Sequence, residues 1–524
     1  MAKNNIKLKN MSVKKYNLFK GTIILTLAGL LTRVLGFFYK IYLSNAMGAE
    51  RLGIYQLIFP IYGICFTIYA TGIQTSLSKL VAAELGRNNY KNIRRLIKIS
   101  LTLSVSMALI LSCLVYWNAD YIAWRFLMEE RTASSLRIMA IVFPFCGITS
   151  SINGYYYGIK KAGIPASTQL LEQLIRILVV YIIALYSGNG DYAVTCEMAV
   201  IGLVIGEIAS CLYNSISMFF NLPSRGFVIN NSNDNSQLYS HKKITKDILQ
   251  LSIPLSTNRL LINILHSVET ILIPTMLRRF GLSNSAALST YGVLTGMSMP
   301  FIMFPTALIN ALAILLLPTI SEAHALNNEK MIGKTTSVSI KYSLIIGILS
   351  TGIFIIFGKD LGITVFNNET AGSYLYVLAW LCPFIYLTST LGSIINGLGK
   401  VHITFINSII GTLSKIALIV VLIPKYGIKG YLIALLIGQL VITILDTYAV
   451  LKNVKFTFPA ADSILKPGLI TALAGFLLRS SYIYIKKMIQ INEIFLILIF
   501  CFIFCIIYIG FLIVTKAISK IDLY

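Results

Sequence analysis

Apolar runs long enough to cross a lipid bilayer recur along the chain from end to end. A transmembrane helix needs about 20 apolar residues, and the sequence predicts fourteen such helices. Their ranges are 19–43, 52–80, 96–117, 134–158, 164–187, 192–220, 247–276, 286–317, 336–357, 371–397, 401–423, 427–451, 463–485 and 493–515. Only 12% of the 524 residues are charged, about half the share in a soluble protein. The sequence therefore predicts an all-α integral membrane protein and excludes a soluble multidomain or a disordered chain.

The net charge of +24 is explained by where the charges lie between the predicted helices. Fourteen spans place both termini on one side of the membrane. Of the 44 Lys and Arg residues, 27 lie on that side, 12 on the opposite side and 5 inside the helices. Because basic loop residues concentrate in the cytoplasm, we expect both termini to be cytoplasmic. This distribution accounts for the charge without a nucleic-acid partner.

The two halves of the chain repeat at a constant offset of 239 residues. The matching positions are Asn88-Asn89 with Asn327-Asn328, Pro144 with Pro383, Arg176 with Lys415, Tyr192 with Tyr431, and Glu207 with Asp446. A repeat of six helices gives two halves of the same topology, a known transporter plan with the substrate site between the halves near the membrane midplane. We therefore expect two six-helix lobes plus two C-terminal helices. The predicted parts are a basic leader (1–18), an N-lobe (19–220), a cytoplasmic linker (221–246), a C-lobe (247–451), and the last two helices with a short tail (452–524).

Polar side chains form stripes on the first and seventh predicted helices. Placing a charged side chain at mid-membrane costs roughly 2.5–3.5 kcal/mol of insertion free energy, so such a residue is expected to have a bonding partner or a function. On the first helix, Arg33 shares one face with Gly29 and Gly36. The seventh helix carries Arg259, Asn263, His266 and Thr270 on one face, with Glu269 beside them. These stripes indicate either a substrate site or a hydrogen-bond network that holds helices together, and Arg33 has the further alternative of reaching a membrane surface.

Charged residues on the fifth, sixth, eleventh and twelfth predicted helices add to this set. Glu172 and Arg176 are four residues apart on the fifth helix and can form an ion pair. Lys415 occupies the place of Arg176 in the second half. Glu207 and Asp446, which also correspond, are either counter-ions or groups that take part in gating or ion coupling.

Three cations, Arg33, Arg259 and Lys415, have no carboxylate three or four residues away. If they face a common cleft, they form a cationic chamber in a low dielectric. Such a chamber suits phosphate or diphosphate, because a guanidinium presents paired donors to the oxygens. A chamber for organic cations would need the opposite sign, which argues against a cation-coupled drug exporter.

Motifs of other chemistries are missing from the sequence. The four His residues are far apart, with no metal-binding spacing, and the eight Cys residues have no CxxC pair. No phosphate-binding Gly loop is present. The largest predicted outer loop, 118–133, contains only Asp120, Glu129 and Glu130 as acids, too few to favour a glycosyltransferase or polymerase. We therefore predict no metal, no cofactor and no enzymatic activity, with transport driven by an ion gradient, the membrane potential or consumption of the substrate.

Three motifs resemble a known family. They are Gly29-Leu-Leu-Thr-Arg33-Val-Leu-Gly36-Phe37, Leu316-Leu-Pro-Thr-Ile-Ser-Glu322 and Ser393-Ile-Ile-Asn396-Gly397. Together with the 6+6+2 plan, they resemble the oligosaccharide-lipid flippases of the MOP superfamily, which includes MATE exporters and MurJ. The stage V sporulation protein B family is the branch that the chain resembles most. The charged Asp-Arg pair of MurJ-type proteins is replaced here by Val293-Leu294, so the chain departs from a standard MurJ.

This resemblance implies a flippase of the bacterial cytoplasmic membrane. It would move an undecaprenyl-diphosphate-linked glycan, such as the peptidoglycan precursor lipid II for spore cortex, to the outer leaflet by alternating access. Arg33 matches the family's first-helix arginine. From these residues we predict a substrate site with Arg33, Arg176 and Arg259 for the diphosphate, Asn263, His266 and Glu269 for sugar or gating, and Glu172 and Lys415 beside them. Expected partners are the bilayer and cell-wall synthases, and we expect a monomer. The alternatives are an exporter of another lipid-linked polysaccharide unit, an ion-coupled MATE-type drug exporter and a non-transporting scaffold.

Overall fold

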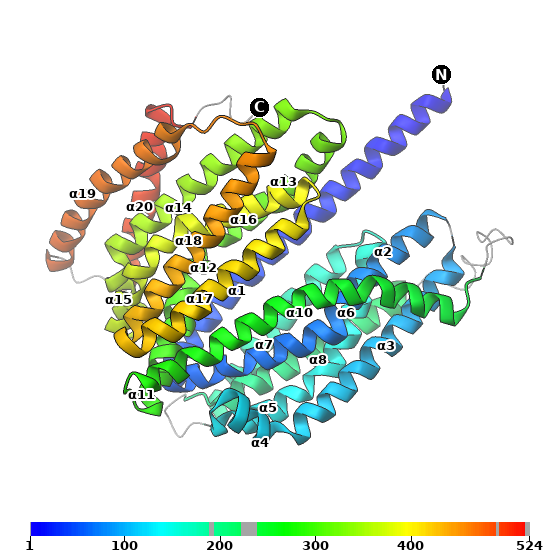
Figure 1. Ribbon diagram of the computed structural model, residues 1–524, viewed down its shortest axis with the longest axis horizontal. Helices are drawn as coiled ribbons and strands as arrows, with labels where there is room; N and C mark the ends of the chain where they lie inside the picture. The colour runs from blue at the N-terminus through cyan, green and yellow to red at the C-terminus, as the bar shows by residue number, and fades with distance from the viewer. Residues whose placement is uncertain (1, 88, 188–192, 222–237, 489–491, 519–524) are drawn as a thin grey trace. The chain divides into compact units, whose positions relative to one another are not determined.

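The computed structural model describes residues 2–87, 89–187, 193–221, 238–488 and 492–518, with side chains from residue 27 onward (Figure 1). Every regular element in these ranges is a helix. Thirteen helices are long and apolar enough to cross a membrane, or fourteen when one bent pair is counted as a span. The predicted all-α membrane fold is confirmed.

The chain packs as two compact units. Unit 1 comprises Met1–Tyr39 and Leu57–Ser267, and unit 2 comprises Lys40–Gln56 and Val268–Tyr524. Two long helices, α1 (Ala2–Phe66) and α10 (His241–Arg279), contribute residues to both. The predicted linker lies outside the described residues at 222–237, whereas its last six residues already belong to α10. The predicted lobe boundaries stay predictions.

Unit 1 is organised around α6. After α1, its elements are η1 (Thr67–Thr71), α2 (Gly72–Gly86), α3 (Tyr90–Trp117), α4 (Ala119–Tyr121), η2 (Ile122–Leu127), η3 (Glu130–Thr132), α5 (Ala133–Ala140), α6 (Val142–Gly158), α7 (Gly163–Ser187) and α8 (Cys196–Asn221). Helix α6 packs against α2, α3 and α8, and α7 packs along α8. Leu77, Ile97 and Tyr156 belong to the hydrophobic core that α2, α3 and α6 share.

Unit 2 repeats this arrangement and adds two helices. Its elements are α11 (Asn284–Gly292), η4 (Val293–Ser298), α12 (Met299–Met303), α13 (Thr306–Ala325), α14 (Glu329–Phe366), α15 (Glu369–Leu378), η5 (Ala379–Leu381), α16 (Cys382–Gly397), α17 (Val401–Tyr426), α18 (Ile428–Asn453), η6 (Ala461–Leu465), α19 (Lys466–Met488) and α20 (Glu493–Val514). Helix α16 packs against α13, α14 and α18, as α6 does against α2, α3 and α8. The additional helices α19 and α20 pack on each other and on α14.

The start of α3 and the start of α14 show the repeat at the level of single hydrogen bonds. The side chain of Asn89 accepts from the backbone N–H of Asn92 at 3.2 Å. The side chain of Asn328, 239 residues later, accepts from the N–H of Met331 at 3.0 Å. Both asparagines are N-caps, which satisfy a backbone donor that the first helical turn leaves free. The repeat found in the sequence is therefore present in the structure.

A second matching pair of bonds explains a bend that the sequence did not predict. Pro144 lacks the N–H that would bind the carbonyl of Ala140, and the hydroxyl of Ser112 donates to that carbonyl at 2.6 Å. The predicted helix 134–158 is consequently two helices, α5 and α6, bent by 46°. In unit 2, the equivalent hydroxyl of Thr351 donates to the carbonyl of Ala379 at 3.0 Å.

The break predicted between the first two helices is confirmed, whereas the predicted helix 286–317 was wrong. The predicted helices 19–43 and 52–80 are separated by a kink at Gly48, inside the range of α1. Gly48 has φ 75° and ψ 169°, a conformation that glycine adopts without steric cost. The predicted helix 286–317 is divided at Phe304-Pro305 and continues to Ala325, because Pro305 has no N–H with which to extend the hydrogen-bond ladder.

Close backbone contact between α1 and α11 within unit 2 depends on two glycines. A Cβ atom at Gly292 would lie 2.0 Å from the carbonyl oxygen of Ala49, and one at Gly53 would lie 2.2 Å from that of Leu288. Small residues allow such approaches between membrane helices. We expect Gly292→Ala to destabilise the protein by about 1–3 kcal/mol, the usual cost of overpacking, as measured by thermal unfolding in detergent. Gly510→Ala is the control, because a Cβ there meets nothing within 4 Å, and equal melting temperatures would contradict the contact.

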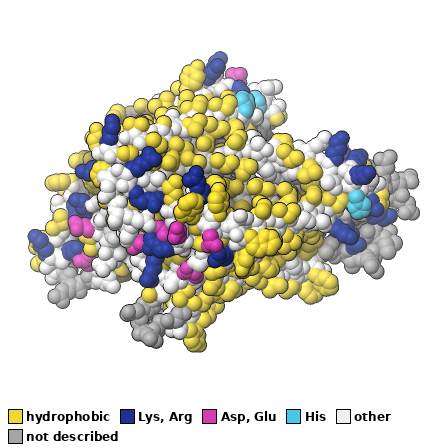
Figure 2. All heavy atoms as spheres, turned by 60° about the horizontal axis from the view of Figure 1, so that its bottom comes forward, with side chains coloured by type: hydrophobic (Ala, Val, Ile, Leu, Met, Phe, Trp, Pro, Cys, Tyr) yellow, Lys and Arg dark blue, Asp and Glu magenta, His cyan; other side chains and the backbone are white. Residues whose placement is uncertain are grey.

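The outer surface of the helices is largely apolar. Figure 2 shows hydrophobic side chains over broad areas, with charged side chains gathered in patches. On α20, for example, Phe495, Phe502 and Val514 are exposed. Exposed apolar areas of this size mark an interaction surface, which in a bundle of spanning helices is the lipid.

Candidate functional site

Helix α7 carries a half-buried ion pair in unit 1. The carboxylate of Glu172 accepts a hydrogen bond from the guanidinium of Arg176, one turn later, which confirms the predicted pair. Gly206 on α8 packs against this turn, since a Cβ there would lie 2.9 Å from the carbonyl oxygen of Glu172. The next residue, Glu207, is buried, and the hydroxyl of Ser210 donates to its carboxylate at 3.5 Å. The close α7–α8 approach therefore places Glu207 next to the helix that carries the pair.

Arg33 on α1 is a cation in an apolar span. Its residue is exposed, and it forms no ion pair with any residue that the structure describes. One turn later, a Cβ at Gly36 would lie 3.8 Å from the amide nitrogen of Gln173. Gly36 on α1 therefore lies beside Gln173 on α7, the residue that follows Glu172, and all three belong to unit 1. Arg33 keeps its full positive charge available to a ligand.

Arg259 and Asn263, two members of the polar stripe on α10, differ in their bonding. Arg259 is exposed and, like Arg33, has no ion pair within the described ranges. The amide of Asn263 donates to the hydroxyl of Thr67 at 2.6 Å and to the carbonyl of Gly63 at 3.3 Å. Those bonds hold α10 against α1 and the π-helical turn η1, the helix-joining role that was the alternative for this stripe. Its sugar contact stays a prediction, as does that of the exposed His266.

Lys415 has no carboxylate three or four residues away in the sequence, but the fold brings one to it from another helix. In unit 2 the ammonium of Lys415 on α17 lies 2.6 Å from the carboxylate of Glu269 on α10. The hydroxyl of Tyr431 on α18 donates to the same carboxylate at 3.4 Å. A search for carboxylates three or four residues away could not find Glu269, because tertiary packing brings it from another helix. Lys415 is therefore neutralised and does not contribute to a cationic chamber.

Asp446, the equivalent of Glu207, is buried on α18. The side-chain amide of Asn407 on α17 donates to its carboxylate at 2.8 Å. This bond joins two neighbouring helices of unit 2, and a polar bond between helices is the expected way to satisfy a carboxylate in a membrane. A part for Glu207 and Asp446 in gating or ion coupling stays a prediction. Asn407 was not among the predicted site residues, and its spacing to Asp446 in sequence gives no signal of the contact.

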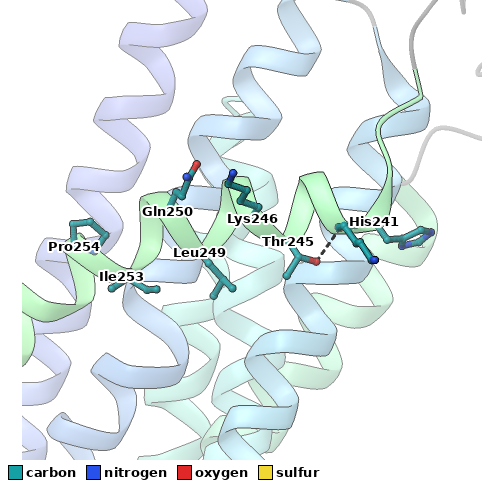
Figure 3. A pocket seen from close by; sticks show the side chains of 8 residues that line it. His241, Thr245, Lys246, Leu249, Gln250, Ile253 and Pro254 are labelled. Carbon is teal, nitrogen blue, oxygen red and sulfur yellow. Dashed lines mark hydrogen bonds between the residues drawn. The ribbon is translucent and has the colours of Figure 1, made fainter.

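A shallow hollow of about 730 Å³ runs along the first turns of α10, in unit 1 (Figure 3). Its lining residues are His241, Lys242, Thr245, Lys246, Leu249, Gln250, Ile253 and Pro254. Lys246 and Gln250 point to the same side in Figure 3, whereas the segment from Leu249 to Pro254 is mainly apolar. The change from basic to apolar residues is typical of a helix that leaves the membrane.

Solved structures share this fold. A structure described as lipid II flippase MurJ in an inward closed conformation matches with a TM-score of 0.69 and 18% identity, over 93% of this chain and 98% of that one. A multidrug resistance MATE family transporter of the MOP superfamily matches with a TM-score of 0.65 and 15% identity, over 80% and 94%. The chain is therefore a multi-pass helical membrane protein that shares the fold of these two transporters.

Sequence comparison then gives the family. The family model described as polysaccharide biosynthesis protein matches residues 18–324, more than half of the chain, and a MatE model matches residues 260–421. The chain belongs to the polysaccharide biosynthesis protein family. Stage V sporulation protein B of Bacillus subtilis (strain 168) is 27% identical over 478 residues, 90% of either chain. Lipid II flippase MurJ of the same organism is 22% identical over 456 residues, 81% of this chain and 80% of that one.

The sequence lacks the charged Asp-Arg pair of MurJ-type proteins, and the structure shows where the two residues in its place lie. Val293 and Leu294, which stand where a charged pair was expected, lie in η4 and are buried. Two apolar side chains in a buried π-helical turn cannot bind a diphosphate. The basic groups of the first and seventh predicted helices therefore remain the candidates for binding a diphosphate.

Proposed function

We propose that the protein is a flippase for a glycan carried on undecaprenyl diphosphate. It moves this substrate from the cytoplasmic to the outer leaflet by alternating access of its two lobes. The observation that carries the proposal is the pair of guanidinium groups, Arg33 and Arg259, that lie in apolar spans without a carboxylate partner among the described residues. Membership of the polysaccharide biosynthesis protein family supports it.

The chemistry of these two residues suits a diphosphate. A guanidinium is charged at every physiological pH and offers paired donors to phosphate oxygens. Arg176 and Lys415, also predicted to bind substrate, are already bonded to Glu172 and Glu269. We therefore assign the diphosphate to Arg33 and Arg259, and we assign the two ion pairs to stabilising one conformation of each unit. Asn263, His266 and Glu269 keep their proposed part in sugar contact or gating.

The proposed substrate is a peptidoglycan precursor such as lipid II, used for spore cortex. The similarity to proteins named stage V sporulation protein B and lipid II flippase MurJ supports this choice. The proposed setting is the bacterial cytoplasmic membrane, with both termini in the cytoplasm and the protein acting as a monomer without catalysis, beside cell-wall synthases. The excess of basic residues in the loops on the N-terminal side supports the orientation.

Depletion of the protein during sporulation tests the proposal. We expect the lipid-linked disaccharide precursor to accumulate, as measured by extraction and mass spectrometry of lipid-linked intermediates. Accumulation of a different lipid-linked oligosaccharide would assign the protein to another polysaccharide. No accumulation of any lipid-linked intermediate would overturn the flippase.

The second candidate is an ion-coupled drug exporter. The MatE family model, which matches residues 260–421, and the MATE fold favour it. Glu207 and Asp446, both buried, would then exchange an ion during transport. This candidate predicts that cells lacking the protein retain cationic dyes, and that Glu207→Gln abolishes dye export. The flippase predicts no change in dye retention.

A further inference from the structure

A cavity of about 700 Å³ lies in unit 2 between α14, the α15–η5–α16 segment and α19. None of the residues assigned above to the substrate lines it. Its volume falls in the range of cavities that hold small molecules or parts of lipids, about 300–1,000 Å³. The side chains that line the cavity determine which kind of ligand fits it.

Most of the lining is apolar, and Gly468 on α19 leaves open space in its wall. Gly352, Gly468 and Gly475 line the cavity together with Ile355 and Phe476. A Cβ at Gly468 would meet nothing within 4 Å. From Gly468 to Arg479, the cavity follows α19 for eleven residues, roughly 16 Å at 1.5 Å per residue. This wall suits a hydrocarbon chain that lies along the helix.

One end of the cavity is basic. Lys359 and Arg479 both line it. The guanidinium of Arg479 donates to the carbonyl of Ile356 at 3.0 Å and pairs with Asp360, while Lys486 lies 2.9 Å from the carboxylate of Glu493. Lys359 is exposed and forms no ion pair with any residue in the described part of the chain. Of the two cations that line the cavity, Lys359 is the one without an ion pair among the described residues, so it can meet an anion from outside.

Two partly exposed aromatic side chains also line the cavity. Trp380 and Tyr376 line the cavity and are 55% and 43% exposed. Tyrosine and tryptophan concentrate where hydrocarbon meets the polar headgroups, because their rings are apolar and their N–H or O–H groups are polar. An apolar groove with partly exposed aromatic rings and an ammonium at one end suits a lipid, whose acyl chain, interfacial region and phosphate these groups can contact.

We propose that this cavity binds one anionic phospholipid, with an acyl chain along α19 and the phosphate at Lys359 and Arg479. Basic pockets between transmembrane helices bind anionic headgroups in this way. A zwitterionic lipid would bring its own cation to the same place and lose the electrostatic gain. The site is separate from the proposed substrate residues, so it holds whether or not the flippase assignment holds.

The full-length protein, purified in detergent, is mixed with phosphatidylglycerol or phosphatidylcholine, and the bound lipid is counted by native mass spectrometry. We expect phosphatidylglycerol to bind about fivefold more tightly, the usual gain for one basic residue near a headgroup. Lys359→Ala should remove that preference. Lys487→Ala, an exposed lysine near the same end that does not line the cavity, should keep it.

A second pair of variants tests the apolar part without changing charge. Gly468→Leu should fill the cavity and lower phosphatidylglycerol binding several-fold, while Gly510→Leu, also in open space on α20, should not. Equal binding of the two lipids, or a preference that survives Lys359→Ala, would overturn the proposal. So would tighter binding of polyprenyl phosphate than of phosphatidylglycerol, or displacement of the lipid by inorganic phosphate. Unchanged elution and melting temperature of each variant show that folding is intact.

Discussion

Arg33→Ala is expected to lower the affinity of the protein for a polyprenyl diphosphate by about tenfold to a hundredfold. A hydrogen bond to a charged group contributes about 1.5–3 kcal/mol, and each 1.4 kcal/mol is a factor of about ten. Arg33 has no competing carboxylate in the described structure, so a ligand phosphate receives its full charge. The measurement is equilibrium binding of the labelled lipid to the purified full-length protein.

Two further variants separate the geometry of Arg33 from its charge. Arg33→Lys keeps the positive charge and loses the paired donors, so it should bind with intermediate affinity. Lys40→Ala removes an exposed cation from the same helix, near the end of the predicted span, and should leave binding unchanged. Wild-type affinity in Arg33→Ala, with normal expression and folding, would remove Arg33 from the site.

Lys415→Ala is expected to lower the free energy of unfolding by about 3–5 kcal/mol. The side chains of Lys415 and Glu269 are 17% and 9% exposed, so removal of the ammonium leaves a buried carboxylate without its cation, and that is the usual cost. The hydroxyl of Tyr431, at 3.4 Å, supplies a dipole and not a charge. Thermal or denaturant unfolding in detergent measures the loss.

The neutral double variant Lys415→Met with Glu269→Gln should recover most of the lost stability, because it removes both charges together. Lys466→Ala is the control. Lys466 lies 2.6 Å from Asp462, but the two side chains are 38% and 31% exposed, and exposed pairs contribute about 0–1 kcal/mol. If Lys415→Ala were no less stable than Lys466→Ala, the buried pair would not have the importance assigned to it.

Spans and repeat could be predicted from the sequence because the bilayer imposes one rule along the whole chain. Every segment inside it must be apolar and about 20 residues long, so hydropathy marks each one. Bends depend on more than the residue at the bend. Pro144 was visible in the sequence, but the break at Ala140 also needs the hydroxyl of Ser112 from another helix.

In the candidate site too, contacts within one helix could be predicted from the sequence, whereas contacts between helices could not. Glu172 and Arg176 are four residues apart on one helix, so helical geometry alone predicts their contact. The pair of Lys415 with Glu269 joins helices far apart in the chain, and only packing brings them together. Asn263 bonds to Thr67 for the same reason. Sequence spacing reports only on carboxylates of the same helix, so it could not reveal the partner of Lys415.

Transport by the reconstituted protein tests the central proposal most directly. Purified full-length protein is placed in vesicles that carry a labelled disaccharide-peptide on undecaprenyl diphosphate, and the fraction of label exposed on the far leaflet is followed over time. The proposed function predicts transfer well above that of protein-free vesicles, with Arg33→Ala reducing the rate at least about tenfold and Lys40→Ala leaving it unchanged. Transfer no faster than in protein-free vesicles, or equal rates for Arg33→Ala and the wild type, would contradict it.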